Sequence, residues 1–534
     1  MFKRALLGPM VLILFAACSA SAQTCPLNGT LSPKLVCLIP QVYGAFGLNT
    51  LPSGTNSSNS VLFTGDRHAA HFSSDFTESF QPINEAVGIQ VSQLPIASPS
   101  SGITFVYDPT LKTFAPSTDE SLGPIVGDRG TTIGKGRLFL GFSFQYFSFD
   151  TIDGQSMSSI PIVLQHQQFL PIPANPPNFA GIAKCDNQTA LAGVYANSPC
   201  LVRDYIQTTN NISLTVHQYT IYVTYGITRH LDVSAAIPIL NVQMGVTSQA
   251  TIVPNSVTPA GAAPGNFWHS FNGGPGVSTS TNNPNPNLAA TCGTQNPCLR
   301  ATFSNSGSSS GIGDVVLRGK YIFYRGERFA AAAGVDVRLP TGDELNFLGS
   351  GATGVKPFGV VSYRARISPH AEAGYEWNGN STLAGTNIVP LPTFPTPTNP
   401  APPTTAVDKA SLPSRFLYVV GADVRATNRL TAAFDIYGQR LFNNPEITSQ
   451  PYTDLGNCSG PTDPTSAACG TYTPGSVHPN VGGHTADINI TDASLGLKYN
   501  VYGKLVITGN VLLKLDDGGL RSKAVPLVGI SYNF

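Results

Sequence analysis

Alternation of apolar and polar residues is the dominant pattern along this chain of 534 residues. In the segment 526–534 every second residue from Pro526 to Phe534 is apolar or aromatic, whereas Ser531 and Asn533 face the other way. This two-residue period is typical of a strand with one apolar face, and it recurs upstream. It predicts twelve strands, at 136–149, 213–226, 230–244, 312–325, 328–340, 354–367, 369–379, 414–426, 429–442, 488–500, 504–516 and 522–534.

The connections between these strands alternate in length. Short turns are expected at 226–230, 325–328, 367–369, 426–429 and 500–504. The alternate connections are mostly long, at 150–212, 245–311, 341–353, 380–413 and 443–487. An outer-membrane β-barrel has an even number of strands, short periplasmic turns and long outer loops. The pattern therefore favours an all-β, antiparallel up-and-down transmembrane barrel of about twelve strands over a soluble sandwich.

Charged residues of the predicted strands fall on one face, which would be the lumen. In 312–325 the predicted outer face carries Val315, Leu317, Tyr321 and Phe323, and the inner face carries Asp314, Arg318, Lys320 and Tyr324. Ten charged residues are predicted to line the pore: Asp314, Arg318, Lys320, Asp336, Arg338, Lys356, Arg364, Arg366, Glu372 and Glu376. Six of the ten are basic. They could form a packed, ion-paired lumen or a selectivity surface with a weak preference for anions.

The N-terminus has the features of a secretory signal. Lys3 and Arg4 precede an apolar run, and Ala20 to Ala22 form a small-residue cleavage site, so residues 1–22 are expected to be removed. Residues 23–135 are rich in Ser, Pro and Asn, and they are expected to be a plug, a periplasmic segment or two more strands of a fourteen-stranded barrel. Residues 136–534 would form the barrel. No later stretch is apolar for long enough to predict a membrane-spanning helix.

Composition agrees with export to a membrane. Only 11% of residues are charged, and 30 Lys and Arg balance 30 Asp and Glu, which argues against a nucleic-acid partner. Nine cysteines are present, and Cys18 lies in the predicted signal. The other eight are sequence neighbours in pairs, which predicts four local disulfides rather than zinc sites. The predicted pairs are Cys25 with Cys37, Cys185 with Cys200, Cys292 with Cys298, and Cys458 with Cys469.

Chemical motifs are sparse. His217 lies near Ser213, but a phospholipase-like arrangement with an orienting group is not found, so an enzyme is not expected. Asp66 to His71 contains two histidines three residues apart, which is too few ligands for a metal site. We therefore expect neither a cofactor nor a metal.

Residues 311–377 resemble a known family. The matching segments are Gly311 to Tyr321, Arg338 to Asp343, Leu348 to Gly351, Pro357, Ser362 to Tyr363 and Gly374 to Tyr375. They look like the transporter family named after the MetA pathway of phenol degradation. The resemblance implies an outer-membrane β-barrel that admits aromatic or other hydrophobic compounds. Similarly, the last strand and Phe534 resemble the closing strand of bacterial outer-membrane barrels, which implies recognition by the barrel assembly machinery.

The sequence therefore predicts a protein of the outer membrane of a Gram-negative-type bacterium, surrounded by lipid. Its expected function is passive uptake of small hydrophobic or aromatic solutes. The alternative is a closed barrel that serves as a surface-display or binding platform through disulfide-tied outer loops.

Overall fold

The fold is described from a computed structural model. It describes residues 25, 31–43, 50–52, 74–95, 105–108, 113–116, 121–165, 184–185, 188–189, 205–253, 269–271, 277–280, 299–385, 409–454, 457–461, 469–473 and 475–534. In this part of the chain, no helix combines the length and hydrophobicity needed to cross a bilayer.

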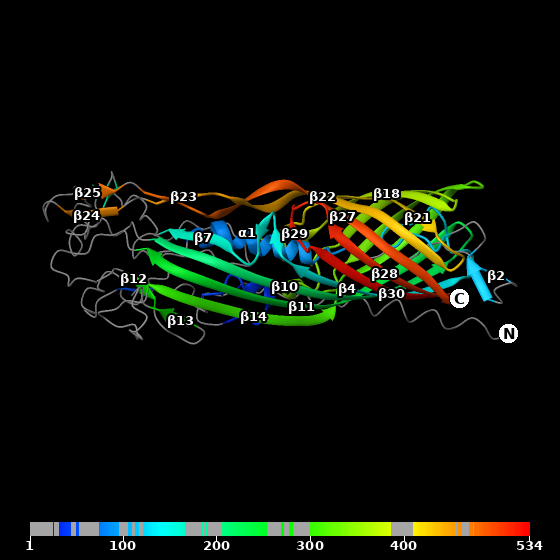
Figure 1. The fold of residues 1–534 in the computed structure, drawn as a ribbon, viewed down its shortest axis with the longest axis horizontal. Helices are drawn as coiled ribbons and strands as arrows, with labels where there is room; N and C mark the ends of the chain where they lie inside the picture. Colours follow the sequence, from blue (N-terminus) through cyan, green and yellow to red (C-terminus); the bar gives the residue numbers. More distant parts are fainter. Residues whose placement is uncertain are drawn as a thin grey trace.

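Twelve antiparallel strands close into a barrel (Figure 1). In ring order they are β4 (Leu138–Phe149), β10 (Tyr205–Gly226), β11 (Leu231–Val253), β15 (Val315–Arg325), β16 (Phe329–Leu339), β17 (Gly354–Tyr363), β18 (Ile367–Asn378), β21 (Arg415–Arg425), β22 (Leu430–Ser449), β27 (Val481–Tyr502), β28 (Leu505–Lys514) and β30 (Ala524–Asn533). Pairing of β30 with β4 closes the ring. The predicted up-and-down topology and the strand count are confirmed.

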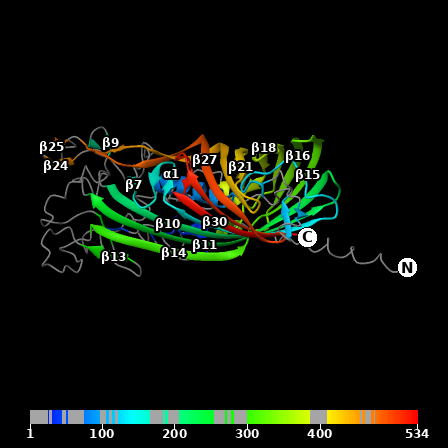
Figure 2. The same ribbon diagram turned by 45° about the vertical axis from the view of Figure 1, so that its right-hand side comes forward.

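Four strands are much longer than a bilayer requires. β10, β11, β22 and β27 have 22, 23, 20 and 22 residues, whereas about 9–11 tilted residues cross the hydrocarbon region. They extend away from the end that carries the C-terminus, as Figures 1 and 2 show. β14 (Arg300–Ile312) adds to this extension, because it continues the line of β15 and pairs with the outer half of β11. Two further strands, β7 (Ile160–Gln165) and β13 (Val277–Ser280), flank the extension.

The remaining strands form small separate sheets. They are β1 (Thr50–Pro52) with β12 (His269–Phe271), β2 (Phe105–Asp108) with β3 (Thr113–Pro116), β5 (Thr151–Ile152) with β6 (Gln155–Ser156) and β29 (Leu520–Arg521), β8 (Lys184–Cys185) with β9 (Gln188–Thr189), β19 (Asn380–Ser381) with β20 (Ala410–Ser411), β23 (Tyr452–Thr453) with β26 (Val477–His478), and β24 (Asn457–Pro461) with β25 (Cys469–Thr473). The β2–β3 hairpin pairs only with itself among the described strands, so it adds no strand to the barrel.

The outer surface of the barrel is apolar at alternate positions. Val528, Ile530 and Phe534 are 56%, 45% and 56% exposed, and β15 exposes Leu317 and Phe323 in the same way. Exposure of large apolar side chains over a closed barrel is the expected surface for contact with lipid. Tyr324 differs from the prediction that it faces inward, because a bulge between Ile322 and Tyr324 shifts the register, and its side chain is 54% exposed.

The described residues before β4 lie mainly inside the barrel. Helix α1 (Ser74–Val91) contacts β22 and β27, and its buried face includes Phe80, Ile83 and Val87. Together with the short helix η1 (Leu35–Cys37), α1 belongs to a large apolar core at the outer end. Two more short helices, η5 (Glu344–Asn346) and η6 (Thr382–Ala384), also contribute to this core. Residues 121–133 occupy the lumen nearer the C-terminal end, where they bond to inward side chains of the wall.

Among the described residues, a disulfide joins Cys25 to Cys37. It ties Cys25 to the last residue of η1. The other three predicted pairs each involve cysteines whose side chains lie outside the described residues, so they stay predictions. The Asp66 to His71 motif also lies outside them.

Candidate functional site: a charged lumen with an internal cavity

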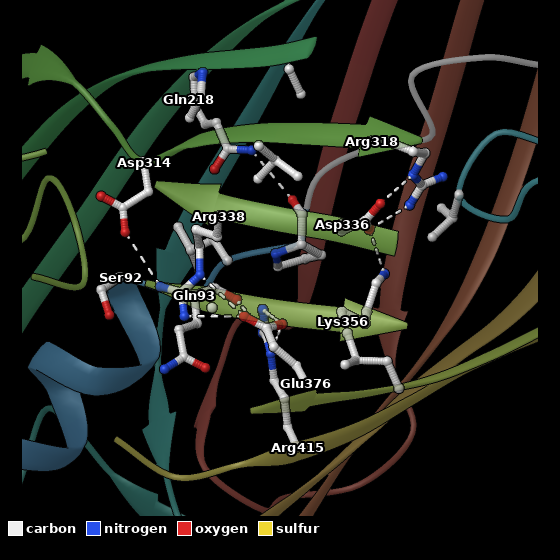
Figure 3. A pocket seen from close by; sticks show the side chains of 18 of the residues that line it. Ser92, Gln93, Gln218, Asp314, Arg318, Asp336, Arg338, Lys356, Glu376 and Arg415 are labelled. Carbon is white, nitrogen blue, oxygen red and sulfur yellow. Dashed lines mark hydrogen bonds and ion pairs between the residues drawn. The ribbon is translucent and has the colours of Figure 1, made fainter. Parts of the chain in front are cut away.

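A cavity of about 150 Å³ lies in the lumen between the wall and the N-terminal segment. The end of α1 and the residues after it, from Val91 to Pro95, supply one side of the cavity. Val126 comes from the internal segment 121–133. Strands β10, β11, β15, β16, β17, β18, β21 and β22 supply the rest, together with Asp314 and Leu348 from the connections between elements. Figure 3 shows charged side chains from several of these strands pointing toward one another across it.

The first charged group of the wall centres on Asp336 of β16. Arg318 of β15 binds this carboxylate with two hydrogen bonds, Nε to Oδ1 at 2.7 Å and Nη2 to Oδ2 at 2.8 Å. Lys356 of β17 approaches Oδ2 to 3.0 Å from the other side, and Glu372 of β18 lies 3.8 Å from both cations. Directly opposed strand positions place them together, since Arg318 pairs with Asp336 and Asp336 with Lys356 in register.

The second charged group centres on Glu376 of β18. Its Oε1 accepts a hydrogen bond from Arg338 at 3.1 Å, and its Oε2 accepts one from Arg415 at 2.8 Å. Arg338 also donates to Asp314, which sits in the break between β14 and β15. Gly354 makes room for this bridge, because a Cβ there would lie 2.5 Å from Glu376 Oε1.

The N-terminal segment is anchored to this charge network through Asp128. The carboxylate is fully buried, and it accepts hydrogen bonds from Lys320 Nζ at 3.0 Å and from Arg318 Nη1 at 3.1 Å. Lys320 is itself only 1% exposed and donates also to the Arg129 carbonyl at 3.2 Å. Two wall cations therefore hold one residue of the internal segment.

A second anchor lies nearer the C-terminal end. Arg129 pairs with Asp423 of β21 at 2.5 Å, and Lys498 of β27 donates to the Pro124 carbonyl at 2.5 Å. His370 of β18 lies between Asp423 and Asp435, with its Nε2 at 2.7 Å from Asp435 Oδ1. Residues 121–133 are thus held by charged side chains from at least four strands.

Eight of the ten predicted pore-lining residues meet in the lumen, and two do not. Arg364 and Arg366 were expected in the strand 354–367, but β17 ends at Tyr363 and β18 begins at Ile367, so both residues lie in the connecting turn. The two-residue alternation does not continue through this turn. The pattern therefore gives no information on the direction of side chains in the turn. The eight predicted residues that do lie in the lumen are four basic and four acidic residues. The basic excess behind the expected anion preference is therefore absent.

Several functional candidates were missed by the sequence pattern. Arg415, Asp423 and Asp435 occupy inward positions of correctly predicted strands, so the same face analysis could have found them. Asp128 and Arg129 lie in a segment without periodicity, and nothing local indicates their partners. Gln93 was also missed: it is 5% exposed, lines the cavity and has both amide atoms without a hydrogen-bond partner among the described residues.

The family described as "Putative MetA-pathway of phenol degradation" matches residues 196–395. The match covers the central part of the chain. This match confirms the resemblance seen in residues 311–377. No curated protein matches the sequence. The match to this family, the closed barrel and its apolar exterior together identify an outer-membrane protein.

Three solved structures resemble this chain at low sequence identity. The COG4313 outer membrane channel from Pseudomonas putida F1 shares 10% identity, with 78% of this chain and 99% of that chain covered at a TM-score of 0.35. A Pseudomonas aeruginosa FadL homologue shares 9% identity, with 75% and 90% covered at 0.26. The Pseudomonas putida toluene transporter TodX shares 10% identity, with 78% and 95% covered at 0.23. At this level of similarity, no residue of these proteins can be equated with a residue of this chain.

Proposed function

We propose that the protein is an outer-membrane channel for passive uptake of small hydrophobic or aromatic molecules, closed by its own N-terminal segment. The cavity between that segment and the wall carries the proposal. One side of the cavity is apolar, with side chains from Leu94, Val126, Leu240, Val316 and Leu417. Its volume of about 150 Å³ matches the size of cavity that holds a single benzene ring. The family description, which names phenol degradation, supports the same class of solute.

The charges of the lumen suit an uncharged solute. Arg318, Lys320, Arg338, Lys356 and Arg415 are balanced by Asp128, Asp314, Asp336, Glu372 and Glu376. Because each charge lies within ion-pair distance of an opposite one, their fields largely cancel beyond the pairs. An ion that entered would lose its hydration without a compensating unpaired charge. An aromatic molecule carries no such cost.

A reversible engineered disulfide between residues 121–133 and the barrel wall tests whether this internal segment must move for uptake. A Cβ at Gly127 would lie 3.0 Å from Val419 Cγ1, so G127C combined with V419C places two thiols within reach of a disulfide. Uptake of a radiolabelled monoaromatic compound is measured in intact cells that lack their own channels for it. We expect uptake in the reduced double variant and little in the oxidised one. G127C alone is the matched control, since the new side chain also meets His370 Nε2 at 2.9 Å.

Equal uptake in the oxidised and reduced forms would show that the internal segment does not gate the path. No uptake above host cells by the wild-type barrel would contradict the channel function itself.

A surface platform is the second candidate, and the long outer extension favours it. β10 and β11 continue for roughly twice the length that crosses a bilayer, and an apolar core fills this region. Such a rigid projection is suited to presenting loops above the membrane. A barrel that carries no solute but retains a specific outer ligand on intact cells would support the platform over the channel.

A further inference from the structure

The short turns at the C-terminal end of the barrel form a strongly basic ring. Ten Lys and Arg residues, of the chain's 30, lie within six short segments that contain one acidic residue, Glu327. These basic ring segments are 134–137, 226–231, 325–329, 363–367, 425–430 and 500–505. Eight of the ten are arginines, and all ten are at least partly exposed.

The opposite end of the barrel has the reverse balance. Its described connections 150–159, 340–353 and 515–523 contain six acidic residues and two basic ones. The basic ring is therefore a property of one end rather than of the whole chain, whose formal net charge is zero.

Backbone hydrogen bonds join neighbouring turns into a continuous rim. The Arg364 N–H donates to the Arg328 carbonyl at 2.6 Å, and the Arg425 N–H donates to the Arg366 carbonyl at 2.9 Å. Farther round, the Asn500 N–H donates to the Arg429 carbonyl at 2.8 Å, and the Gly226 N–H to the Arg137 carbonyl at 3.0 Å. The cationic side chains are thus fixed at one level by the wall itself, not carried on long loops.

Aromatic side chains mark this level as the membrane boundary. Tyr324 immediately precedes Arg325, Phe329 follows Arg328, and Tyr363 precedes Arg364. The three aromatic side chains are 54%, 42% and 40% exposed. Exposed aromatic residues at the edge of the apolar band lie at the depth of the lipid headgroups. The arginines one residue away can extend their guanidinium groups into the same layer.

We propose that the basic ring binds the phosphate groups of anionic phospholipids in the inner leaflet of the outer membrane. Guanidinium groups bind phosphate oxygens in a bidentate geometry, which explains the use of arginine at eight of ten positions. Arg325, Arg328, Arg364 and Arg366 form the densest part, because their two turns are hydrogen-bonded neighbours. Binding there fixes the depth of the barrel and concentrates anionic lipid around it.

Lipid competition measured beside the ring tests this directly. Phe323 is 64% exposed on the lipid face, so F323W places a fluorescent reporter two residues from Arg325. The full-length barrel is refolded in vesicles of brominated phosphatidylcholine, which quenches the reporter, and unbrominated phosphatidylglycerol or phosphatidylcholine is added. The protein without F323W supplies the background. Recovery of fluorescence gives the relative affinity of the two lipids.

We expect phosphatidylglycerol to be preferred by about fivefold or more at low salt, since one nearby cationic side chain contributes about that factor. The preference should weaken at high salt. The variant R325Q, R328Q, R364Q and R366Q should lower it to nearly equal affinity. The matched control R300Q, K409Q, R440Q and K523Q removes four exposed cations from the opposite end, and it should retain the preference.

Three results would overturn the proposal: no preference in the wild-type protein, an unchanged preference in the ring variant, or an equal loss in the control. The third would indicate an effect of net charge alone. If the fourfold variant does not fold into a heat-modifiable barrel, R325Q with R328Q is measured in the same way. Capture of an acidic periplasmic protein by the ring without lipid preference would also contradict it.

Discussion

Replacing Asp128 by Asn tests how firmly the internal segment is held. The carboxylate is fully buried and binds both Lys320 and Arg318. Asn has a similar shape but carries no charge. Arg318 keeps its two hydrogen bonds to Asp336, whereas Lys320 retains only the Arg129 carbonyl at 3.2 Å. The variant therefore leaves one buried ammonium group without an ion pair, while the Asp232 carboxylate, opposite Lys320 in register on β11, interacts with it at longer range.

The expected cost follows from the loss of that single buried ion pair. Removing one partner of a buried ion pair costs about 3–5 kcal/mol. Arg318 contributes little to this cost because Asp336 still neutralises it. Removing Lys320 as well, in D128N with K320M, should restore most of the loss, because the buried ammonium group is then absent. The double variant separates the charge effect from the loss of the carboxylate's shape.

Thiol labelling of the internal segment measures this cost. Ile125 is 3% exposed in the lumen, so I125C is protected from a water-soluble maleimide unless the segment detaches. A loss of 3 kcal/mol should speed labelling by about two orders of magnitude in D128N, since about 1.4 kcal/mol corresponds to tenfold. The double variant should label nearly as slowly as I125C alone. A change of less than about threefold in D128N would refute the assignment of Asp128 as an anchor.

Three more predictions concern other parts of the molecule. Burial raises the pKa of Asp153 to about 6 in the folded outer region, so this group adds stability as the pH falls from 7 to 4.5; thermal unfolding of D153N should show a weaker pH dependence than that of the wild type. F534A should lower the amount of assembled barrel in the outer membrane but leave the unfolding midpoint of refolded protein unchanged. V335R, at the middle of a lipid-facing strand, should cost about 2–4 kcal/mol in urea unfolding from bilayers, whereas V477R at the exposed outer end should be neutral.

The barrel could be predicted from sequence because membrane strands obey a local rule. Lipid demands an apolar side chain at every second position, and each strand shows this without knowledge of its partners. All twelve strands were located in this way. The rule fails where the two-residue period ends, as at Arg364 and Arg366 in a turn, and where a bulge shifts it, as at Tyr324.

The internal segment could not be predicted because its contacts are distant in sequence and irregular. Asp128 pairs with residues about 190 positions away, and its neighbours show neither helical nor strand periodicity. The sequence suggested a plug only as one of three alternatives for 23–135. Likewise, the predicted charges of the wall indicated a lumen but not its occupant, since the same inward residues suit an open pore or a filled one.

The geometry of the shared arginine indicates how such a closed lumen can open. Arg318 binds the wall through Asp336 and the internal segment through Asp128, so it keeps a full counter-charge when the segment leaves. Lys320 does not, but departure of residues 121–133 would admit water to the space they fill, and hydration would then replace Asp128. At this first anchor, the energetic penalty of opening therefore falls on one ammonium group, which water can hydrate. If the cations of the wall had no carboxylate partners within the wall, they would bind the acidic side chain of the internal segment too strongly for it to detach.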